Sequence, residues 1–235
     1  MYLLNLVVTL LVAIASTTAL AQEAGGISSS SISRCAGRIG MDTREADAAF
    51  SAILLDGMPW VTIERVEDQV GTQTISTVVT GTGARRRRDG TFVPFRYTCL
   101  LDTKGQAVML HTSHPAPQLG DTLPPATMID GSAAYAETTL PRGAELRIQL
   151  LDKSTSAPEE ILAEQVVRIG RPTPIPFALR VPKDVSLDGR NLAIAARLVV
   201  GRQTLFQLKE PRAVVADDLR KSIDLTLEKV DQAKR

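Results

Sequence analysis

The chain has 235 residues, of which 27 are Lys or Arg and 26 are Asp or Glu, so its formal net charge is +1. This balance gives no electrostatic basis for nucleic-acid binding, which needs a surplus of positive charge. Aromatic residues make up only 4% of the chain, so the core has to be built mainly from Val, Ile, Leu and Ala.

An apolar run at the start of the sequence predicts export. Residues 2–21 (YLLNLVVTLLVAIASTTALA) close in Ala19-Leu20-Ala21, the small-x-small pattern of a signal peptidase site. We therefore expect residues 1–21 to be a signal peptide, cleaved near Ala21, and the mature protein to be periplasmic. Because the first five residues hold no Lys or Arg, an uncleaved N-terminal membrane anchor is the alternative. No cysteine follows the run that could carry a lipid, and no later segment is long and apolar enough to span a membrane.

The chain contains two cysteines, Cys35 and Cys99. In an oxidising compartment an even pair predicts a disulfide, which would restrict the unfolded chain over a loop of about 65 residues. Two buried thiols or a redox pair are the alternatives, although the C-x-x-C spacing that lowers a thiol pKa is missing.

The segment after the signal peptide divides into a predicted linker and a predicted helix. Residues 22–33 (QEAGGISSSSIS) are rich in Gly and Ser and predict a flexible linker. Asp42-Thr43-Arg44-Glu45 has the form of a capping box, and apolar residues follow it at helical spacing up to Leu54. Gly57 and Pro59 suit the end of such a helix, so we expect a helix over residues 43–56.

The pattern then changes to that of strands. Val, Ile, Thr and aromatic residues are concentrated at 60–66, 72–84, 91–101 and 106–114, with Asp89-Gly90 as a hairpin turn. Residues 34–114 are therefore predicted to form a small α+β domain that the disulfide staples. Residues 115–126 contain the proline-rich stretch PAPQLGDTLPP and predict a semi-rigid linker, because proline cannot donate a sheet hydrogen bond.

Residues 127–235 are predicted to form an antiparallel β-sandwich. Short strand patterns recur at 128–140, 144–152, 161–169, 175–181, 191–200, 203–208 and 223–227, and about seven strands in this length are typical of that architecture. The predicted fold class is thus mainly β with one helix: a small α+β domain followed by an antiparallel β-sandwich.

Several of these strand sequences come in an order that resembles one family. They are residues 146–152 (LRIQLLD), 161–165 (ILAEQ), 174–179 (PIPFAL), 191–198 (NLAIAARL) and Leu205-Phe206. This order resembles the YbaY-type envelope lipoproteins, a family that includes the YscW pilotins of type III secretion. The resemblance covers residues 127–230 and implies a β-sandwich at the cell envelope with a binding or chaperone role, an envelope or secretion-apparatus protein as partner, and no catalysis. The chain departs from the family because it lacks the lipidated cysteine and carries an additional N-terminal domain.

The run Arg85-Arg86-Arg87-Arg88 is the most basic segment of the chain. It could contact an anionic lipid, lipopolysaccharide or an acidic partner. Successive side chains of a strand alternate between its faces, so the four guanidinium groups cannot all line one face. The alternative is a solvated hairpin end whose charge discourages edge pairing.

Other residue patterns give little support for catalysis or metal binding. His111 and His114 would point to opposite faces of a strand, and no Cys or carboxylate nearby completes a metal site. No G-x-S-x-G, P-loop or G-x-G-x-x-G motif is present, and Trp60 is expected in the core. We therefore predict no catalytic residue, cofactor or metal, and interpret the chain as a non-enzymatic periplasmic binding or accessory protein. A periplasmic inhibitor or stress protein that binds a protease or a polysaccharide is the alternative, and an enzyme with a dispersed site is a third hypothesis.

Overall fold

The structure, a computed structural model, describes residues 19–46, 49–116, 122–136, 139–154, 159–169, 173–215 and 217–230. Within these ranges it contains one α-helix, thirteen strands and a short 3-10 helix, so the predicted class of mainly β with one helix is confirmed. Most of the predicted signal peptide lies outside the described residues, and its last three residues begin α1. None of the described helices is both long and apolar enough to cross a membrane.

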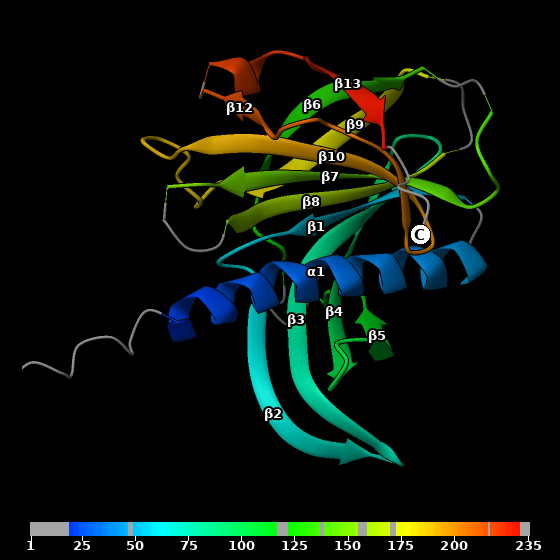
Figure 1. Cartoon of the computed structure of the whole chain (residues 1–235), viewed down its shortest axis with the longest axis vertical. Helices are drawn as coiled ribbons and strands as arrows, with labels where there is room; N and C mark the ends of the chain where they lie inside the picture. Colours follow the sequence, from blue (N-terminus) through cyan, green and yellow to red (C-terminus); the bar gives the residue numbers. More distant parts are fainter. Residues whose placement is uncertain are drawn as a thin grey trace, which may run out of the picture.

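The helix α1 spans Ala19–Ala46 and precedes every strand (Figure 1). The first five strands are β1 Phe50–Asp56, β2 Thr62–Val70, β3 Gln73–Arg87, β4 Phe92–Asp102 and β5 Ala107–Ser113. The remaining elements are β6 Ala126–Tyr135, β7 Ala144–Asp152, β8 Glu160–Arg168, β9 Ile175–Pro182, β10 Leu192–Val200, β11 Gln203–Gln207, β12 Arg212–Val214, the 3-10 helix η2 Asp218–Arg220 and β13 Ile223–Lys229.

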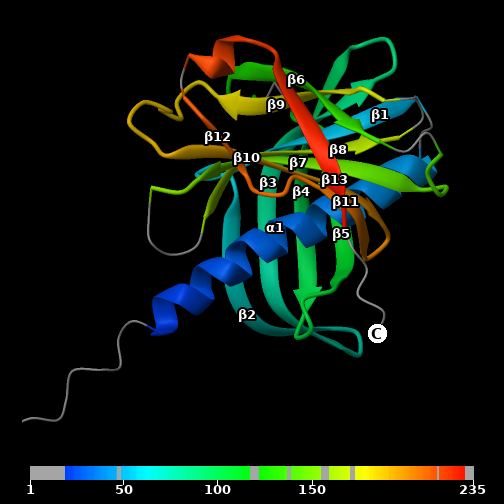
Figure 2. The ribbon, with the colours of Figure 1, turned by 45° about the horizontal axis from the view of Figure 1, so that its top comes forward.

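Hydrogen bonds join the strands into one continuous sheet, in the order β5-β4-β3-β1-β8-β7-β10-β11-β13-β6-β9, with β2 added to β3 and β12 to β10. The sheet turns back on itself at β11 and β13, so that β6 and β9 form a second layer over β1, β8 and β7. Figure 2 shows β6 and β9 at one end of the molecule and β2 at the other. Among the described pairs, β6 and β13 are the ones that run parallel, whereas the sequence predicted an antiparallel sandwich throughout.

Two hydrophobic cores lie on opposite faces of β1. Ala52 and Leu54 point into the core beneath the second layer, whereas Ile53 and Leu55 point into the core beneath α1. All four side chains are buried. A strand that is buried on both faces reads as a continuous apolar run rather than as an alternation.

That burial explains why the predicted helix over residues 43–56 is wrong. The apolar run Ala52–Leu55 fits a helix and a doubly buried strand equally well, and periodicity alone does not separate them. In the structure α1 ends at Ala46, and Asp42, the predicted N-cap, instead forms an ion pair with Arg38 one turn earlier, at 3.0 Å.

Residues 22–33 are also helical, contrary to the flexible linker predicted from their Gly and Ser content. The helix is held by an apolar stripe that begins at the end of this segment. Ile32, Cys35, Ala36 and Ile39 have the i, i+3, i+4, i+7 spacing of one helix face, and all are buried against the sheet. Packing of this stripe therefore outweighs the weak helix propensity of the serines and glycines.

The segments predicted as two domains share hydrogen bonds. β1, from the first segment, pairs with β3 along one edge and with β8, from the second segment, along the other. The boundary at residues 115–126 remains a prediction, and residues 117–121 within it lie outside the described residues. The sheet is continuous across the two segments.

Close packing at Gly131 gives a test of the second layer. A Cβ atom at this position would overlap the ring of Phe177 and the carbonyl oxygen of Ile223. We expect Gly131→Ala to lower the free energy of unfolding by about 1–3 kcal/mol, because the packed core has no room for the methyl group. In Gly40→Ala, on α1, the new methyl meets only ordinary contacts and removes a helix glycine, so stability should hold or rise. Urea unfolding of both variants measures the difference, and equal stabilities would contradict this account of the packing.

Candidate functional site

The β2–β5 part of the sheet is covered on one face only. Val79, Phe95 and Cys99 point towards α1 and are buried there. Side chains alternate along a strand, so their neighbours point to the opposite face, which β6 and β9 do not reach. We call this the open face; it carries Thr62, Glu64, Val78, Thr80, Thr82, Arg96, Thr98, Leu100, Met109, His111 and Ser113.

The strand register arranges these residues in rows that cross the strands. One row is Thr62, Thr80, Thr98 and His111, in which each residue is the direct partner of the next. A second row holds Thr82, Arg96 and Ser113. The row on the other side of the threonines, Glu64, Val78, Leu100 and Met109, is mainly apolar. The register therefore places the hydroxyl and cationic groups of the open face side by side.

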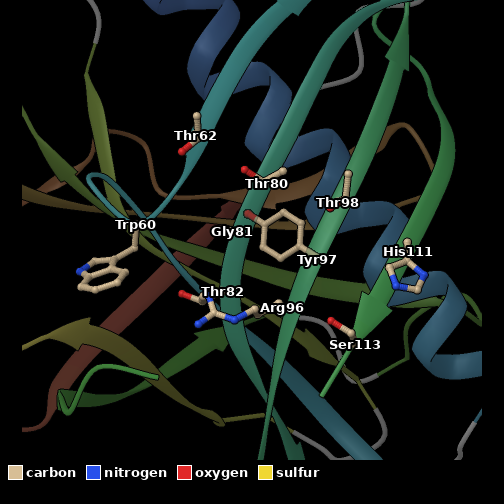
Figure 3. Close-up of a pocket in the computed structure, with 10 residues that line it drawn as sticks. All are labelled: Trp60, Thr62, Thr80, Gly81, Thr82, Arg96, Tyr97, Thr98, His111 and Ser113. Carbon is tan, nitrogen blue, oxygen red and sulfur yellow. The ribbon is translucent and has the colours of Figure 1, made fainter. Parts of the chain in front are cut away.

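A hollow of about 330 Å³ lies over the two polar rows (Figure 3). Its lining contains five Thr or Ser side chains, one indole, one guanidinium and one imidazole, from Thr62, Thr80, Thr82, Thr98, Ser113, Trp60, Arg96 and His111. Tyr97 and Gly81 complete the lining, and none of these ten residues is acidic. The lining therefore presents several hydroxyl groups that can donate and accept hydrogen bonds.

Trp60 and Thr82, on one side of the hollow, lie beside the end of the second layer. Trp60 follows the β1 strand, packs partly against the core under the second layer, and donates a hydrogen bond from Nε1 to Asp184 Oδ1 at 3.1 Å. Thr82 Oγ1 donates to Asp56 Oδ2 at 2.5 Å, and the other carboxylate oxygen of Asp56 accepts from Arg180 of β9. These bonds fix the position of Trp60 and Thr82 relative to the sandwich.

Asp56 is fully buried, with an exposed fraction of 0%. Burial raises its pKa above the ordinary value, and the nearby Arg180 and the Thr82 hydroxyl oppose that rise. The guanidinium of Arg180 also donates to the carbonyl oxygen of Pro124, two residues before the start of β6. Asp56 and Arg180 therefore join β1, β3 and β9 at one buried point.

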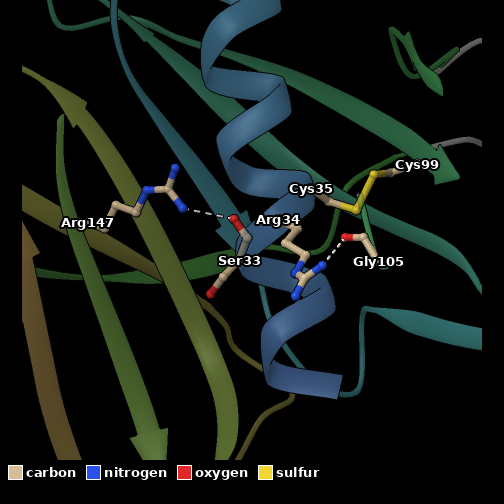
Figure 4. The surroundings of a disulfide bond; sticks show 6 residues. All are labelled: Ser33, Arg34, Cys35, Cys99, Gly105 and Arg147. Atoms are coloured by element: carbon tan, nitrogen blue, oxygen red, sulfur yellow. Dashed lines mark hydrogen bonds between the residues drawn. A yellow bond between two sulfur atoms is a disulfide. The ribbon is translucent and has the colours of Figure 1, made fainter. Parts of the chain in front are cut away.

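On the other side of the sheet, α1 is bonded to both segments of the chain (Figure 4). Cys35 forms a disulfide with Cys99 of β4, with the Cα atoms 6.0 Å apart, which is the predicted pairing. Arg34 Nη1 donates to the carbonyl oxygen of Lys104 at 2.7 Å and to that of Gly105. These contacts fix α1 to the β4–β5 hairpin.

Ser33 makes the matching contacts to the sandwich. Its carbonyl oxygen accepts from Arg147 Nη1 at 3.0 Å, and its hydroxyl oxygen accepts from Gln149 Nε2 at 2.9 Å. Gln149 also donates to Glu164 Oε2 at 3.1 Å. Glu164 is 1% exposed, and its burial raises its pKa, an effect that Arg147 opposes. A polar cluster thus lies beneath the helix at its contact with β7 and β8.

The structure separates Arg85, Arg86, Arg87 and Arg88, for which the sequence left open contact with an anionic surface or a solvated hairpin end. Arg85 is half-buried, lies 4.7 Å over the Phe95 ring and donates to Thr112 Oγ1 at 3.0 Å. Arg86 lies over Phe92, and Arg87 over Phe50. Arg88 is exposed in the turn between β3 and β4. The cations therefore point to different faces, as alternation requires, and contact with an anionic surface remains a prediction for them.

The two histidines are likewise separated. His111 lies on the open face within the polar row, whereas His114 follows the end of β5. In the described part of the chain, no three His, Cys, Asp or Glu side chains gather in a way that could hold a metal ion. The sequence interpretation of Trp60 as a core residue describes only part of its surroundings, because it also lines the hollow.

Part of the chain matches the model of one known protein family. Residues 124–227 match the family described as type III secretion system lipoprotein chaperone (YscW). The matched region comprises β6–β13 and ends inside the last strand. A solved structure, an alternative pilotin from the type II secretion system of Vibrio cholerae, is 25% identical, with a TM-score of 0.42, covering 46% of this chain and 100% of the pilotin. No curated protein matches the chain.

Sequence reasoning missed the hollow because its residues become neighbours only through the register. The alternating Thr80-Gly81-Thr82 pattern is the available signal, since it places two hydroxyls on one face of a strand. Gly81 leaves room for the ring of its cross-strand partner Tyr97, which would overlap a Cβ atom there.

The disulfide should contribute a large part of the stability. It closes a loop with a sequence separation of 64 residues, and both cysteines are fully buried. We expect the double variant Cys35→Ala, Cys99→Ala to lose about 2–5 kcal/mol of unfolding free energy. Urea unfolding with and without reductant measures this. Reductant should lower the stability of the parent and leave the variant unchanged; a parent insensitive to reductant would contradict the assignment.

The raised pKa of Glu164 predicts a pH dependence of stability. A carboxyl that holds its proton more tightly when folded contributes stability that is complete below its ordinary value of 4.5 and is lost as the pH rises through its folded pKa. Glu164→Gln keeps the shape without the charge, so it should be more stable than the parent at pH 8 and lose less stability between pH 4.5 and 8. Thermal unfolding across that range measures both effects.

Glu228→Gln is the matched control, because Glu228 is exposed at the end of β13. It should leave the pH dependence as it is in the parent. If Glu164→Gln is less stable than the parent at pH 8, the charged carboxylate is stabilised by Arg147 and the direction of the pKa shift is wrong.

Proposed function

We propose that this chain is a non-enzymatic accessory protein of the cell envelope that binds a component of a secretion or assembly apparatus. The observation that carries this proposal is the match of residues 124–227 to a family of secretion lipoprotein chaperones. The role is proposed for the whole chain, although that match covers less than half of it. Localisation in the periplasm, by cleavage near Ala21 or by an uncleaved anchor, is part of the same proposal.

The edge strand β5 is the surface where we expect the partner to bind. β5 is hydrogen-bonded to β4 along one edge, and it ends the described order of strands on that side (Figure 1). Its sequence, AVMLHTS, contains no Lys, Arg, Asp, Glu or Pro. Edge strands usually carry such residues, which prevent pairing with other chains. The other edge at this end of the sheet, β2, does carry them, at Glu64, Arg65, Glu67 and Asp68.

These features suit an extended segment of the partner that adds to the β5 edge. Main-chain hydrogen bonds would supply affinity, and the exposed side chain of Met109, 47% accessible, would supply apolar contact. Binding of this kind needs no catalytic residues, which agrees with the sequence interpretation.

The proposal predicts that a photo-reactive residue cross-links to the partner from the β5 edge but not from the second segment. A photo-reactive residue at Met109 of the full-length chain, expressed in cells and irradiated, should give a discrete adduct that mass spectrometry identifies as a secretion or envelope-assembly subunit. The same residue at Val215, which is 64% exposed on the second segment, is the control and should give no such adduct.

Other outcomes decide between the alternatives. A protease trapped at either position would favour an inhibitor, and turnover of a substrate panel by the purified protein would favour an enzyme. Either result, or equal adducts at Met109 and Val215, would contradict a chaperone-like role for the β5 edge.

A further inference from the structure

We propose that the end of the β3–β4 hairpin docks the protein on a membrane surface that carries anionic phospholipids. We call residues 86–94 the hairpin end; they comprise the last two residues of β3, the turn and the first three residues of β4. The protein partner proposed above binds elsewhere, because β5 stops opposite Arg96 and does not reach the hairpin end. Phe92 lies four residues further along β4, about 13 Å away.

Phe92 gives the hairpin end an exposed apolar ring. Its side chain is 45% accessible, and it is the aromatic one among the large hydrophobic residues that are exposed in the described part of the chain. Pro94 is also exposed, and it lies on the same side of β4 because side chains two residues apart share a face of the strand. Transfer of an exposed aromatic ring from water into an apolar layer is favourable.

Arg86 lies beside that ring. The two residues are direct register partners on β3 and β4, and Cζ of Arg86 is 5.9 Å from the centroid of the Phe92 ring. A ring offers no oxygen acceptor, so this contact leaves the N–H donors of the guanidinium available to phosphate oxygens. The hairpin end therefore presents an apolar ring and a phosphate-binding group next to each other.

Two more cations lie at the turn. Arg87 ends β3 and Arg88 follows it, and both side chains are exposed. Arg87 lies over Phe50, with Cζ 5.6 Å from the ring centroid. Throughout the described ranges, neither these two side chains nor Arg86 forms an ion pair. The three guanidinium groups therefore keep their full charge available to an anionic surface.

Asp89 is the acidic residue of the hairpin end, and it is bonded within the turn. Its Oδ1 accepts hydrogen bonds from the backbone N of Thr91 at 2.9 Å and from the Thr91 hydroxyl at 2.7 Å. Three arginines and one aspartate leave a net charge of +2 on residues 86–94, whereas the whole chain of 235 residues carries +1. The positive charge of the molecule is thus concentrated beside Phe92.

A membrane can contact all three cations although alternation separates them along the strand. Alternation prevents the arginines from lining one face of the sheet, but a surface that approaches the hairpin end-on meets the last residues of β3 and the turn together. The long stems of arginine allow the charged groups to bend towards phosphates while a ring enters the apolar boundary. An acidic protein surface would neutralise the arginines but would leave Phe92 against polar groups, so the ring favours lipid.

A tryptophan introduced at position 92 reports whether the ring enters lipid. The double variant Trp60→Phe, Phe92→Trp confines the emission to the hairpin end, because Trp60 is the single tryptophan of the chain. The full-length variant is titrated with vesicles of phosphatidylglycerol or of phosphatidylcholine whose acyl chains carry bromine. Phosphatidylglycerol is expected to shift the emission to shorter wavelength and to quench it. Phosphatidylcholine should need about tenfold or more lipid for the same quenching.

The matched control for the probe is Trp60→Phe, Val215→Trp, at a side chain that is 64% exposed on the second segment. Its emission should not be quenched. The apolar run at residues 2–21 is the same in both probe variants, so any contribution it makes to vesicle binding is common to them.

Charge variants in the Phe92→Trp background test the arginines. Each cation near an anionic membrane is worth about fivefold in binding, so Arg86→Gln, Arg87→Gln, Arg88→Gln should need about tenfold or more phosphatidylglycerol. The matched control removes the same charge at three other exposed positions, with the changes Arg65→Gln, Arg142→Gln and Arg202→Gln, and should bind as the parent does. Circular dichroism confirms that each variant is folded. High salt should weaken quenching of the unchanged hairpin end without any substitution of the arginines.

Four results would overturn the proposal: equal quenching by the two lipids, equal quenching at positions 92 and 215, an equal loss of binding in the two arginine triples, or an emission change with polyglutamate but not with phosphatidylglycerol. The last result would indicate an acidic protein as the partner of the hairpin end. The cross-link at Met109 tests the proposed function on its own, so failure of either experiment leaves the other result unchanged.

Discussion

The arrangement of the molecule depends on β1, which is hydrogen-bonded along both edges and buried on both faces. Its partners are β3 from the first segment and β8 from the second. Its two faces contribute to both hydrophobic cores, and its last residue, Asp56, contacts Thr82 and Arg180. With β1 in this position, β2–β5 and the sandwich share one sheet.

The two faces of that sheet are covered unequally. α1 covers one face and is fixed to both segments, through Cys35 and Arg34 on one side and Ser33 on the other. The second layer covers the opposite face only over the sandwich, so the corresponding side of β2–β5 stays open. The side chains follow this division: Ala52 and Leu54 lie under the second layer, and threonines lie on the open face. The candidate site is a consequence of where the second layer stops.

Strands that alternate apolar with polar residues could be predicted from the sequence. β7 was predicted at its observed limits, because Leu146, Ile148 and Leu150 alternate with polar residues. β1 was not, because a strand buried on both faces loses that alternation and resembles a helix. β12 has three residues and gives no pattern. The start of α1 was hidden by its serines and glycines, although the spacing of Ile32, Cys35, Ala36 and Ile39 was present in the sequence.

The candidate site was harder to predict, because it depends on pairing between strands rather than on any local motif. Thr62, Thr80, Thr98 and His111 are separated by 13 to 18 residues and form a row only when three registers are fixed. The residues that stood out in the sequence, the four arginines, are separated by the same alternation that assembles the threonines. The disulfide was predictable because only two cysteines exist and compartment chemistry pairs them.

The position of β1 between β3 and β8 also constrains how the molecule assembles. β1 lies near the beginning of the chain, but β8, its partner on one edge, is made more than a hundred residues later. A chain that emerges from its N-terminus therefore holds β1 with an unpaired edge until the later strands arrive. Such distant pairings slow folding and leave hydrophobic edges open to other chains in the interval. The first strand to be synthesised is thus among the last to gain both of its hydrogen-bonded partners. Until the second half has formed, the nascent protein exposes an unpaired strand edge that can associate with other chains.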